Sequence, residues 1–209
     1  MKPGSYPVPE KAGLGVHVTL GQEVDDAEQL TGTVVQAARD KGIYVRGAIS
    51  TAVGCPYEGD VAPERVELVA RLMKESGVQH GGVADTIGVG TPRKVQAAME
   101  ATLKHFGIDQ VSGHFHDTYG QALSNTLAAL EMGVWNFQSS VSGLGGCPYA
   151  KGATGNVATE DVVYLLHGMG IATGIDLDAL VDAGVYISEQ LGRPTGSRVA
   201  RALLAKRAG

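Results

Sequence analysis

Residues 111–134, VSGHFHDTYGQALSNTLAALEMGV, contain one complete strand-to-helix unit. Residues 111–115 form a short β-rich run, and a helical pattern follows from about Tyr119 to Met132. A further β-rich run begins directly afterwards, at residues 134–141. A strand, a helix and a second strand in this order are typical of a βαβ unit, in which the two strands are parallel.

The same alternation extends along the chain in both directions. Upstream, we expect three strands, at residues 14–20, 43–49 and 78–84. Helical patterns separate them, at residues 25–41, 62–76 and 92–106. Three helical stretches finish the chain, at residues 159–169, 176–192 and 196–207. We therefore predict an irregular lead-in over residues 1–13 and one domain of parallel βα units over residues 14–209.

Polar residues at the predicted strand ends favour a barrel. Parallel strands are covered on both faces or close into a barrel, and a barrel carries its working residues after the strand C-termini. Four consecutive predicted strands end in polar or glycine-rich segments, at residues 54–57, 85–86, 116–117 and 143–146. The runner-up is a doubly wound open sheet, but its G-x-G-x-x-G motif after a first strand is missing.

The number of strands predicts an incomplete barrel. Five strands cannot close an eight-stranded (β/α) TIM-type barrel, which usually needs about 250 residues. We expect about five βα units, without the first strands and with extra C-terminal helices. Three explanations for the missing strands stay open: the protein has lost its first βα units, a partner supplies them, or the reading frame is truncated at its N-terminus. Open barrel edges would favour association, so a homo-oligomer is among the partners we consider.

Composition excludes several classes of function. The chain has 17 basic and 22 acidic residues and no Lys/Arg cluster, which argues against nucleic-acid binding. No apolar run approaches the roughly 20 residues that span a membrane, and residues 1–13 lack the apolar core of a secretory signal. The two cysteines, Cys55 and Cys147, imply no disulfide framework, so we expect a cytoplasmic protein.

Two histidines and an asparagine are candidate metal ligands. His114 and His116 share one face, because alternate side chains of a strand do so, and two imidazoles at a strand end can bind a divalent metal ion. A polar pair at a barrel rim is an equally simple interpretation. Asn156 offers an oxygen to a hard cation, or caps the next helix. Asp117 orients an imidazole or caps a helix, and we prefer the cap.

Three further residues are candidates for acid–base chemistry. Cys147 follows three glycines, and a cysteine on a mobile glycine loop can close over a substrate and transfer a proton. A small residue packed at a turn is the alternative for Cys147. Asp85 ends a predicted strand, where it can be a base, a hydrogen-bond acceptor or a turn residue. Glu160 opens a predicted helix, where the helix dipole alone favours an acid.

Taken together, four segments resemble the 3-hydroxy-3-methylglutaryl-CoA lyase family. They are VRGAISTAVGCPYEG (45–59), ADTIGVGTP (84–92), HFHDTYGQALSNTLAALEMGV (114–134) and SSVSGLGGCPYAKGATGNVATEDVVYLL (139–166). The GLGGCPYA stretch is similar to the signature glycine loop of that family and is far more specific than the paired histidines. Barrels that condense acetyl-CoA with 2-oxo acids share the histidines, but are not expected to carry this cysteine loop.

The resemblance implies a role for each candidate. The ligands of Mg²⁺ or Mn²⁺ would be His114, His116 and Asn156. The catalytic residues would be Cys147 as the acid/base at the reacting carbon, Asp85 and Glu160. The substrate-binding residues would be Gly145 and Gly146. The implied reaction cleaves an acyl-CoA substrate, 3-hydroxy-3-methylglutaryl-CoA, to acetyl-CoA and acetoacetate, as in leucine degradation.

One departure from the family keeps other functions open. The family carries an arginine–aspartate pair at its first strand, and residues 1–13, MKPGSYPVPEKAG, contain neither. Water could complete a three-residue cation site, but one lost stabilising donor typically costs about 10²–10³-fold in rate. Two alternatives to the lyase are a non-catalytic partial barrel that binds or assembles, and another metal aldolase or condensing enzyme of this barrel type.

Overall fold

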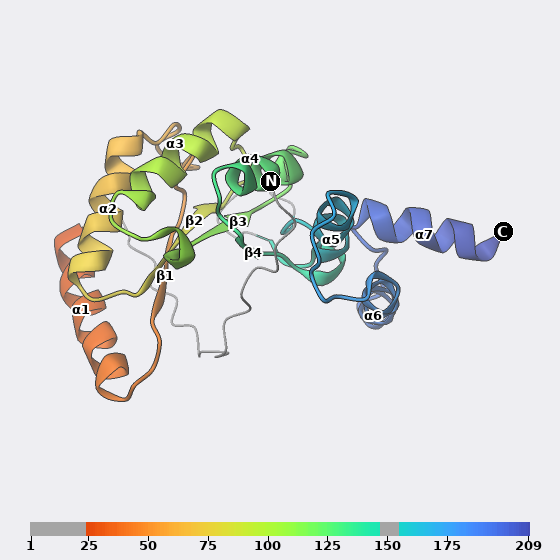
Figure 1. Cartoon of the computed structure of the whole chain (residues 1–209), viewed down its shortest axis with the longest axis horizontal. Helices are drawn as coiled ribbons and strands as arrows, with labels where there is room; N and C mark the ends of the chain where they lie inside the picture. Colours follow the sequence, from red (N-terminus) through yellow and green to blue (C-terminus); the bar gives the residue numbers. More distant parts are fainter. Residues whose placement is uncertain (1–23, 147–154) are drawn as a thin grey trace.

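The computed structural model describes residues 24–146 and 155–209, and its centre is a four-stranded parallel sheet (Figure 1). The strand order is β1-β2-β3-β4. The strands are β1 (Arg46–Ile49), β2 (His80–Asp85), β3 (Val111–Phe115) and β4 (Asn136–Gln138). Ala84 of β2 pairs with His114 of β3, which pairs in turn with Gln138 of β4. A parallel sheet whose order follows the sequence is the arrangement of a partial (β/α) barrel.

Helices connect the strands and then continue beyond the last one. The helices that accompany the sheet are α1 (Val24–Asp40), α2 (Pro63–Glu75), α3 (Pro92–Leu103), the short 3-10 helix η1 (Ile108–Gln110) and α4 (Ala122–Glu131). The later ones are the 3-10 helix η2 (Val141–Gly143), α5 (Thr159–Gly168), α6 (Leu177–Gln190) and α7 (Arg198–Ala208). Figure 1 shows α5, α6 and α7 grouped beyond β4, away from α1 and α2.

The two faces of the sheet differ in chemistry because side chains alternate along a strand. The face toward the helices is apolar: Val83, Val111 and Phe115 are buried in one core with residues of α2 and α3 such as Val66 and Met99. The opposite face, which would line the barrel interior, carries polar side chains. They are Arg46, His80, His114, Asn136 and Gln138. The polar residues of the sheet therefore lie where a barrel places a site.

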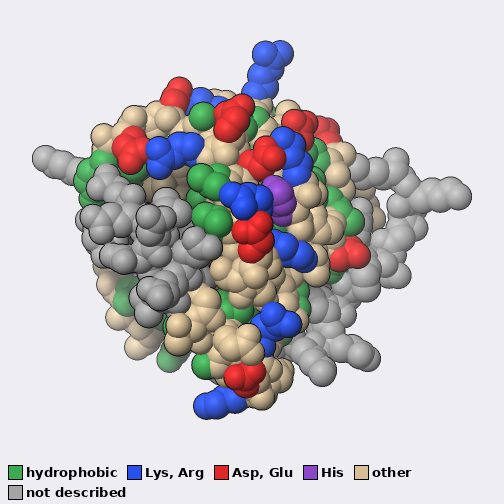
Figure 2. All heavy atoms as spheres, turned by 90° about the vertical axis from the view of Figure 1, so that its left-hand side faces the viewer, with side chains coloured by type: hydrophobic (Ala, Val, Ile, Leu, Met, Phe, Trp, Pro, Cys, Tyr) green, Lys and Arg blue, Asp and Glu red, His purple; other side chains and the backbone are tan. Residues whose placement is uncertain are grey.

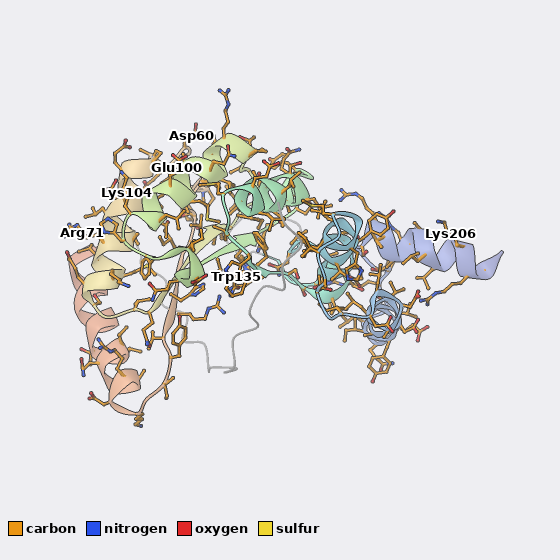
Figure 3. All side chains as sticks on the ribbon, in the orientation of Figure 1. Asp60, Arg71, Glu100, Lys104, Trp135 and Lys206 are labelled. Atoms are coloured by element: carbon orange, nitrogen blue, oxygen red, sulfur yellow. The ribbon has the colours of Figure 1, made fainter. Side chains whose placement is uncertain are left out.

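Charges on the outer helices are mixed in sign. Arg71 and Lys104, both labelled in Figure 3, pair with Glu75 and Glu67 at 3.0 and 2.5 Å. Figure 2 shows basic and acidic side chains interspersed over the face that carries the first helices. Over residues 24–146 and 155–209, no helix is both long and apolar enough to cross a membrane.

Most predicted elements are confirmed, and several are shorter at an end: the strand predicted at 43–49 begins at Arg46, and the helix predicted at 92–106 ends at Leu103. The predicted strand at 134–141 is shorter, because β4 ends at Gln138 and Ser142 adopts a left-handed conformation with φ 56°. The helix expected from about Tyr119 begins at Ala122, because Gly120 has φ +69° and closes a turn with the Asp117 carbonyl. The predicted strand at 14–20 lies outside the described residues.

Candidate active site

The paired histidines lie at the C-terminal end of β3. The ring centroids of His114 and His116 are 5.4 Å apart. Nδ1 of His114 lies 3.0 Å from Oε1 of Gln138 on β4. An amide oxygen accepts hydrogen bonds, so this contact fits the tautomer that carries its proton on Nδ1 and its lone pair on Nε2. A hydrogen bond of this kind fixes the tautomer and the ring orientation of a histidine that binds metal through its other nitrogen.

A distant segment brings Asn156 to the end of β3. The backbone N–H of Val157 donates to the Phe115 carbonyl at 3.1 Å, and the N–H of Asp117 donates to the Gly155 carbonyl at 3.2 Å. His116 and Asn156 thus face each other in an antiparallel bridge. The structure therefore gathers the three predicted metal ligands, although 40 residues separate His116 from Asn156 along the chain.

Among the described residues, the Asn156 side chain is hydrogen-bonded through its amide nitrogen but not through its amide oxygen. Its Nδ2 donates to the Leu144 carbonyl at 2.9 Å. Its Oδ1 is buried, and no hydrogen-bond donor among the described residues reaches it. The N-cap of α5 is Ala158, so the alternative in which Asn156 caps this helix is wrong. A buried carbonyl oxygen left without a donor costs about 1–3 kcal/mol, and a cation would offset that cost.

These residues fit a divalent metal ion. Two imidazoles and an amide oxygen are ligands that Mn²⁺ accepts, and Mg²⁺ takes the oxygen with water at its other positions. The described residues contain no group of three or more His, Cys, Asp or Glu side chains that could hold a metal ion. A cation here would consequently depend on the Asn156 oxygen, on water, and on ligands beyond the described set.

The predicted substrate-binding glycines differ in what surrounds them. Gly145 has φ +99°, and a Cβ atom there would lie 2.6 Å from Nδ2 of Asn156. Gly155 approaches the backbone so closely that a Cβ would overlap the Gly143 carbonyl oxygen. A Cβ at Gly146 would meet no atom of the described residues within 4 Å. The first part of the glycine loop is therefore shaped around Asn156, while Cys147 lies outside the described residues.

Asp85 organises the turn that follows β2. It is fully buried, and its Oδ1 and Oδ2 accept the backbone N–H groups of Val89 and Gly90 at 3.0 and 2.9 Å. Burial raises the pKa of this carboxyl group, and the backbone donors oppose the shift. Asp85 alternates with Ala84, so it belongs to the face that packs against the helices. These contacts are those of a turn residue; a catalytic role for Asp85 stays a prediction.

Glu160 is also fully buried, in the first turn of α5. Both carboxylate oxygens lie 3.0 Å from the backbone nitrogen of Ser142, whose N–H they share. Burial raises the pKa of Glu160, backbone hydrogen bonds oppose the shift, and the adjacent Asp161 adds to it. Glu160 therefore supports the backbone before the glycine loop, and its catalytic role stays a prediction.

Asp117 accepts a hydrogen bond from the start of α4, as in the capping role that we preferred for it, although the N-cap residue of α4 is Gln121. Its Oδ1 accepts the N–H of Ala122, the first residue of α4, at 3.0 Å. Its Oδ2 lies 2.9 Å from Nη1 of Arg198, the first residue of α7. Asp117 thus links the end of β3 to both a neighbouring helix and the last helix of the chain.

Comparison with known proteins assigns this fold to a family. The profile of a family described as HMGL-like matches residues 12–187. The chain belongs to the HMGL-like family. A curated relative from Pseudomonas aeruginosa, 3-hydroxy-3-isohexenylglutaryl-CoA/hydroxy-methylglutaryl-CoA lyase, is 55% identical over 173 residues, which are 83% of this chain and 58% of the relative. The HMGL-like chain thus spans little more than half of that enzyme.

Solved structures confirm the barrel architecture. The crystal structure of hydroxymethylglutaryl-CoA lyase from Pseudomonas aeruginosa matches with a TM-score of 0.86 and 48% identity, over 92% of this chain and 67% of the other. An HMG-CoA lyase from Acinetobacter baumannii, in complex with coenzyme A and 3-methylmalate, matches with a TM-score of 0.84 and 32% identity, over 90% and 64%. The HMGL-like chain is therefore a partial barrel of the lyase type.

Two residues of this candidate site were not predicted from the sequence. Gln138 orients His114, but that contact depends on the register between β3 and β4. Gln138 follows Asn136 by two residues and so shares its strand face, and this spacing could have predicted that Gln138 points toward the site. Ser142 donates its backbone N–H to the Glu160 carboxylate, so the type of its side chain could not have predicted this contact.

Proposed function

We propose that this chain carries the metal-binding and glycine-loop part of a carbon–carbon lyase that cleaves 3-hydroxy-3-methylglutaryl-CoA to acetyl-CoA and acetoacetate. The observation that carries the proposal is the buried Oδ1 of Asn156, which has no donor among the described residues and lies in the segment bridged to His116. An acyl-CoA substrate is supported by the names of the relatives and by the coenzyme A in the Acinetobacter complex.

In this proposal His114, His116 and Asn156 hold Mg²⁺ or Mn²⁺, which when bound would acidify the substrate hydroxyl and fix its geometry. Gln138 keeps His114 in the tautomer whose Nε2 is the ligand, and the Leu144 carbonyl keeps Oδ1 of Asn156 turned away from the loop backbone. These contacts orient the ligands before substrate arrives, which reduces the reorganisation needed during reaction.

The chemistry needs two proton transfers. A base removes the hydroxyl proton, the adjacent carbon–carbon bond breaks as the carbonyl of acetoacetate forms, and the bonding electrons pass to the thioester enolate. We propose that Cys147, on the glycine loop, then gives its thiol proton to the enolate carbon to yield acetyl-CoA. General acid–base catalysis of such a step typically contributes about 10²–10⁴-fold.

The test is acetoacetate release with Mg²⁺ or Mn²⁺, comparing the chain with its Cys147→Ala and Asn156→Ala variants. Cys55→Ala is the matched control, because Cys55 belongs to a separate turn in which it bridges Gly59. We expect metal-dependent release that both site variants abolish and the control retains. Release that is unchanged in Cys147→Ala or independent of metal would overturn the proposal.

The relative from Pseudomonas aeruginosa gives a specific reason to test a second substrate. Its name includes 3-hydroxy-3-isohexenylglutaryl-CoA, which differs in the group at C3. Comparing kcat/KM for the methyl and isohexenyl substrates would assign the preference. A role in leucine degradation requires the methyl substrate, and the two cysteines of the chain fit a reducing compartment such as the cytoplasm.

Absence of turnover would distinguish two remaining functions. A folded chain that binds Mn²⁺ but cleaves neither substrate would fit a binding or assembly module, and size-exclusion chromatography would then report whether it associates with itself. Condensation of acetyl-CoA with a 2-oxo acid would instead identify another enzyme of the same barrel type.

A further inference from the structure

We infer that Ser142 is a positioning residue: its left-handed backbone, fixed by α5, α6 and the segment before α7, sets the Leu144 carbonyl that orients Asn156. The inference deepens the proposed function, on which it rests insofar as Asn156 binds a metal ion. It assigns a task to helices that pack beyond β4.

The backbone of Ser142 adopts a conformation that serine rarely takes. Its φ and ψ are 56° and 16° in the middle of η2. Among the described residues other than glycine, only Thr51 and Ser142 have positive φ. A side chain with a Cβ is destabilised in this region, so the conformation persists only where surrounding contacts determine it.

Four polar contacts determine it here. The N–H of Ser142 is shared by the two oxygens of Glu160, and its carbonyl accepts the N–H of Gly196 at 2.9 Å. Its Oγ donates to the Gly184 carbonyl at 3.1 Å and accepts from Oγ of Ser188 at 3.4 Å. Ser142 is 3% exposed, so these contacts replace water at every polar atom of the residue.

Two glycines give Ser142 the room that these contacts need. A Cβ at Gly184 would lie 2.7 Å from Oε1 of Glu160 and 2.8 Å from Oγ of Ser142. A Cβ at Gly196 would lie 2.7 Å from the Ser142 carbonyl oxygen. Neither glycine has a positive φ, so the close approach rather than the backbone conformation requires glycine at both positions.

A short path connects Ser142 to Asn156. Two residues after Ser142, the Leu144 carbonyl accepts Nδ2 of Asn156, while the N–H of Leu144 is held by the Val141 carbonyl at 3.1 Å. Nδ2 and Oδ1 are opposite ends of one planar amide. Fixing Nδ2 therefore fixes the direction of Oδ1, the atom that we assign to the metal ion.

The first experiment measures Mn²⁺ affinity by electron paramagnetic resonance in Ser142→Ala and Ser142→Gly. Both variants lose the Oγ contacts. In Ser142→Gly the left-handed backbone is no longer strained, so this variant should fold even if Ser142→Ala does not. Losing such support for a ligand typically weakens metal binding about tenfold or more, and we expect that here. Ser76→Ala is the matched control, because Ser76 Oγ donates to the Leu72 carbonyl at the end of α2, and it should bind Mn²⁺ like the wild type.

A double-mutant cycle tests whether Ser142 acts through Asn156. In an Asn156→Ala background, the Ser142 substitutions should weaken Mn²⁺ binding no further, because residues that act as one unit are not additive. An additional loss equal to that seen in the wild-type background would overturn the inference.

A readout without metal keeps this inference separate from the proposed function. The side-chain amide signals of Asn156 in a ¹⁵N spectrum, assigned by their disappearance in Asn156→Ala, should shift in Ser142→Gly and stay in place in Ser76→Ala. Unshifted signals in Ser142→Gly would contradict the positioning role. Shifted signals in a chain that binds no Mn²⁺ would support that role while overturning the metal site.

Discussion

On the inner face of the sheet, burial sets the protonation of single residues. His80 is 3% exposed, and Nη2 of Arg46 lies 3.0 Å from its Nε2. Burial and the nearby guanidinium cation lower the pKa of His80 to about 4. His80 is therefore neutral at pH 7, and its Nε2 accepts a hydrogen bond from Arg46, which also donates to Oδ1 of Asn136 at 3.2 Å.

This pKa predicts a loss of stability in acid. In the unfolded chain His80 takes up a proton near its ordinary pKa of about 6.5, whereas folded His80 does so only near pH 4, so acid favours unfolding between these values. The contribution is at most about 3 kcal/mol. His80→Gln keeps an acceptor for Arg46 and should lose less free energy of unfolding between pH 7 and pH 4.5 than the wild type.

The two buried carboxyl groups change the stability with pH in the opposite direction to His80. Asp85 and Glu160 have raised pKa values in the folded chain, so the stability that they add in acid is lost as pH rises through those values. They are present in both proteins of the His80 comparison, and their effect cancels in the difference. Equal losses in wild type and His80→Gln would show that His80 is not the group responsible.

Neighbouring glycines provide a second residue-level prediction. Gly145→Ala places a Cβ at φ +99° and 2.6 Å from Nδ2 of Asn156, so it should displace that amide and weaken Mn²⁺ binding about tenfold or more. Gly146→Ala, one residue later, places a Cβ that meets no atom within 4 Å in the part of the chain that the structure describes, and should bind Mn²⁺ normally. Isothermal titration of both variants makes the comparison; equal affinities would mean that the loop is not built around Asn156.

Among the secondary-structure elements, the C-terminal helices are joined to the barrel through α5. Asp161, at the start of α5, is 4% exposed. Its Oδ1 accepts Oγ of Ser197 at 2.5 Å and the N–H of Val199 at 2.9 Å, so it holds the first turn of α7. The pair between Asp117 and Arg198 adds a second link from β3. These contacts hold the start of α7 against α5, and so position the segment before α7 in which Gly196 contacts Ser142.

Asp161→Asn should detach α7 from this position. In this variant a neutral amide replaces the carboxylate that accepts hydrogen bonds from Ser197 and Val199. Hydrogen bonds to a charged group are worth about 1.5–3 kcal/mol. We expect a loss of about 2–3 kcal/mol in the free energy of unfolding by urea. Asp182→Asn, which removes an exposed pairing with Arg207, should change it little. Similar losses in both variants would contradict this assignment.

Element boundaries show what the sequence could predict. Residues 111–115 were predicted as a strand and form β3 without a change, because alternation and flanking turns are local signals. The end of β4 was not predictable, because the left-handed Ser142 is held by Glu160, Gly184 and Gly196, which follow it by 18 to 54 residues. The candidate metal ligands were predicted from their residue types and the family motif, and that role stays a prediction, whereas Gln138 required the strand register.

At the scale of the whole molecule, the chain supplies part of a barrel with its polar face inward. Within the described residues β1 and β4 are the outer strands of the sheet, and the polar row of Arg46, His80 and Asn136 crosses between them. The sheet thus presents the C-terminal ends of its strands, where the paired histidines, Asn156 and the glycine loop meet. Two solved HMG-CoA lyase structures match this part with TM-scores of 0.86 and 0.84.

We propose that His114, His116 and Asn156 form one divalent-cation site. Mn²⁺ titration of the chain, followed by electron paramagnetic resonance and compared with Asn156→Ala, is the experiment that decides it. We predict a single site in the wild type whose affinity falls about tenfold or more when the Asn156 oxygen is removed. Equal Mn²⁺ affinity in the two proteins, or no binding in either, would contradict the account.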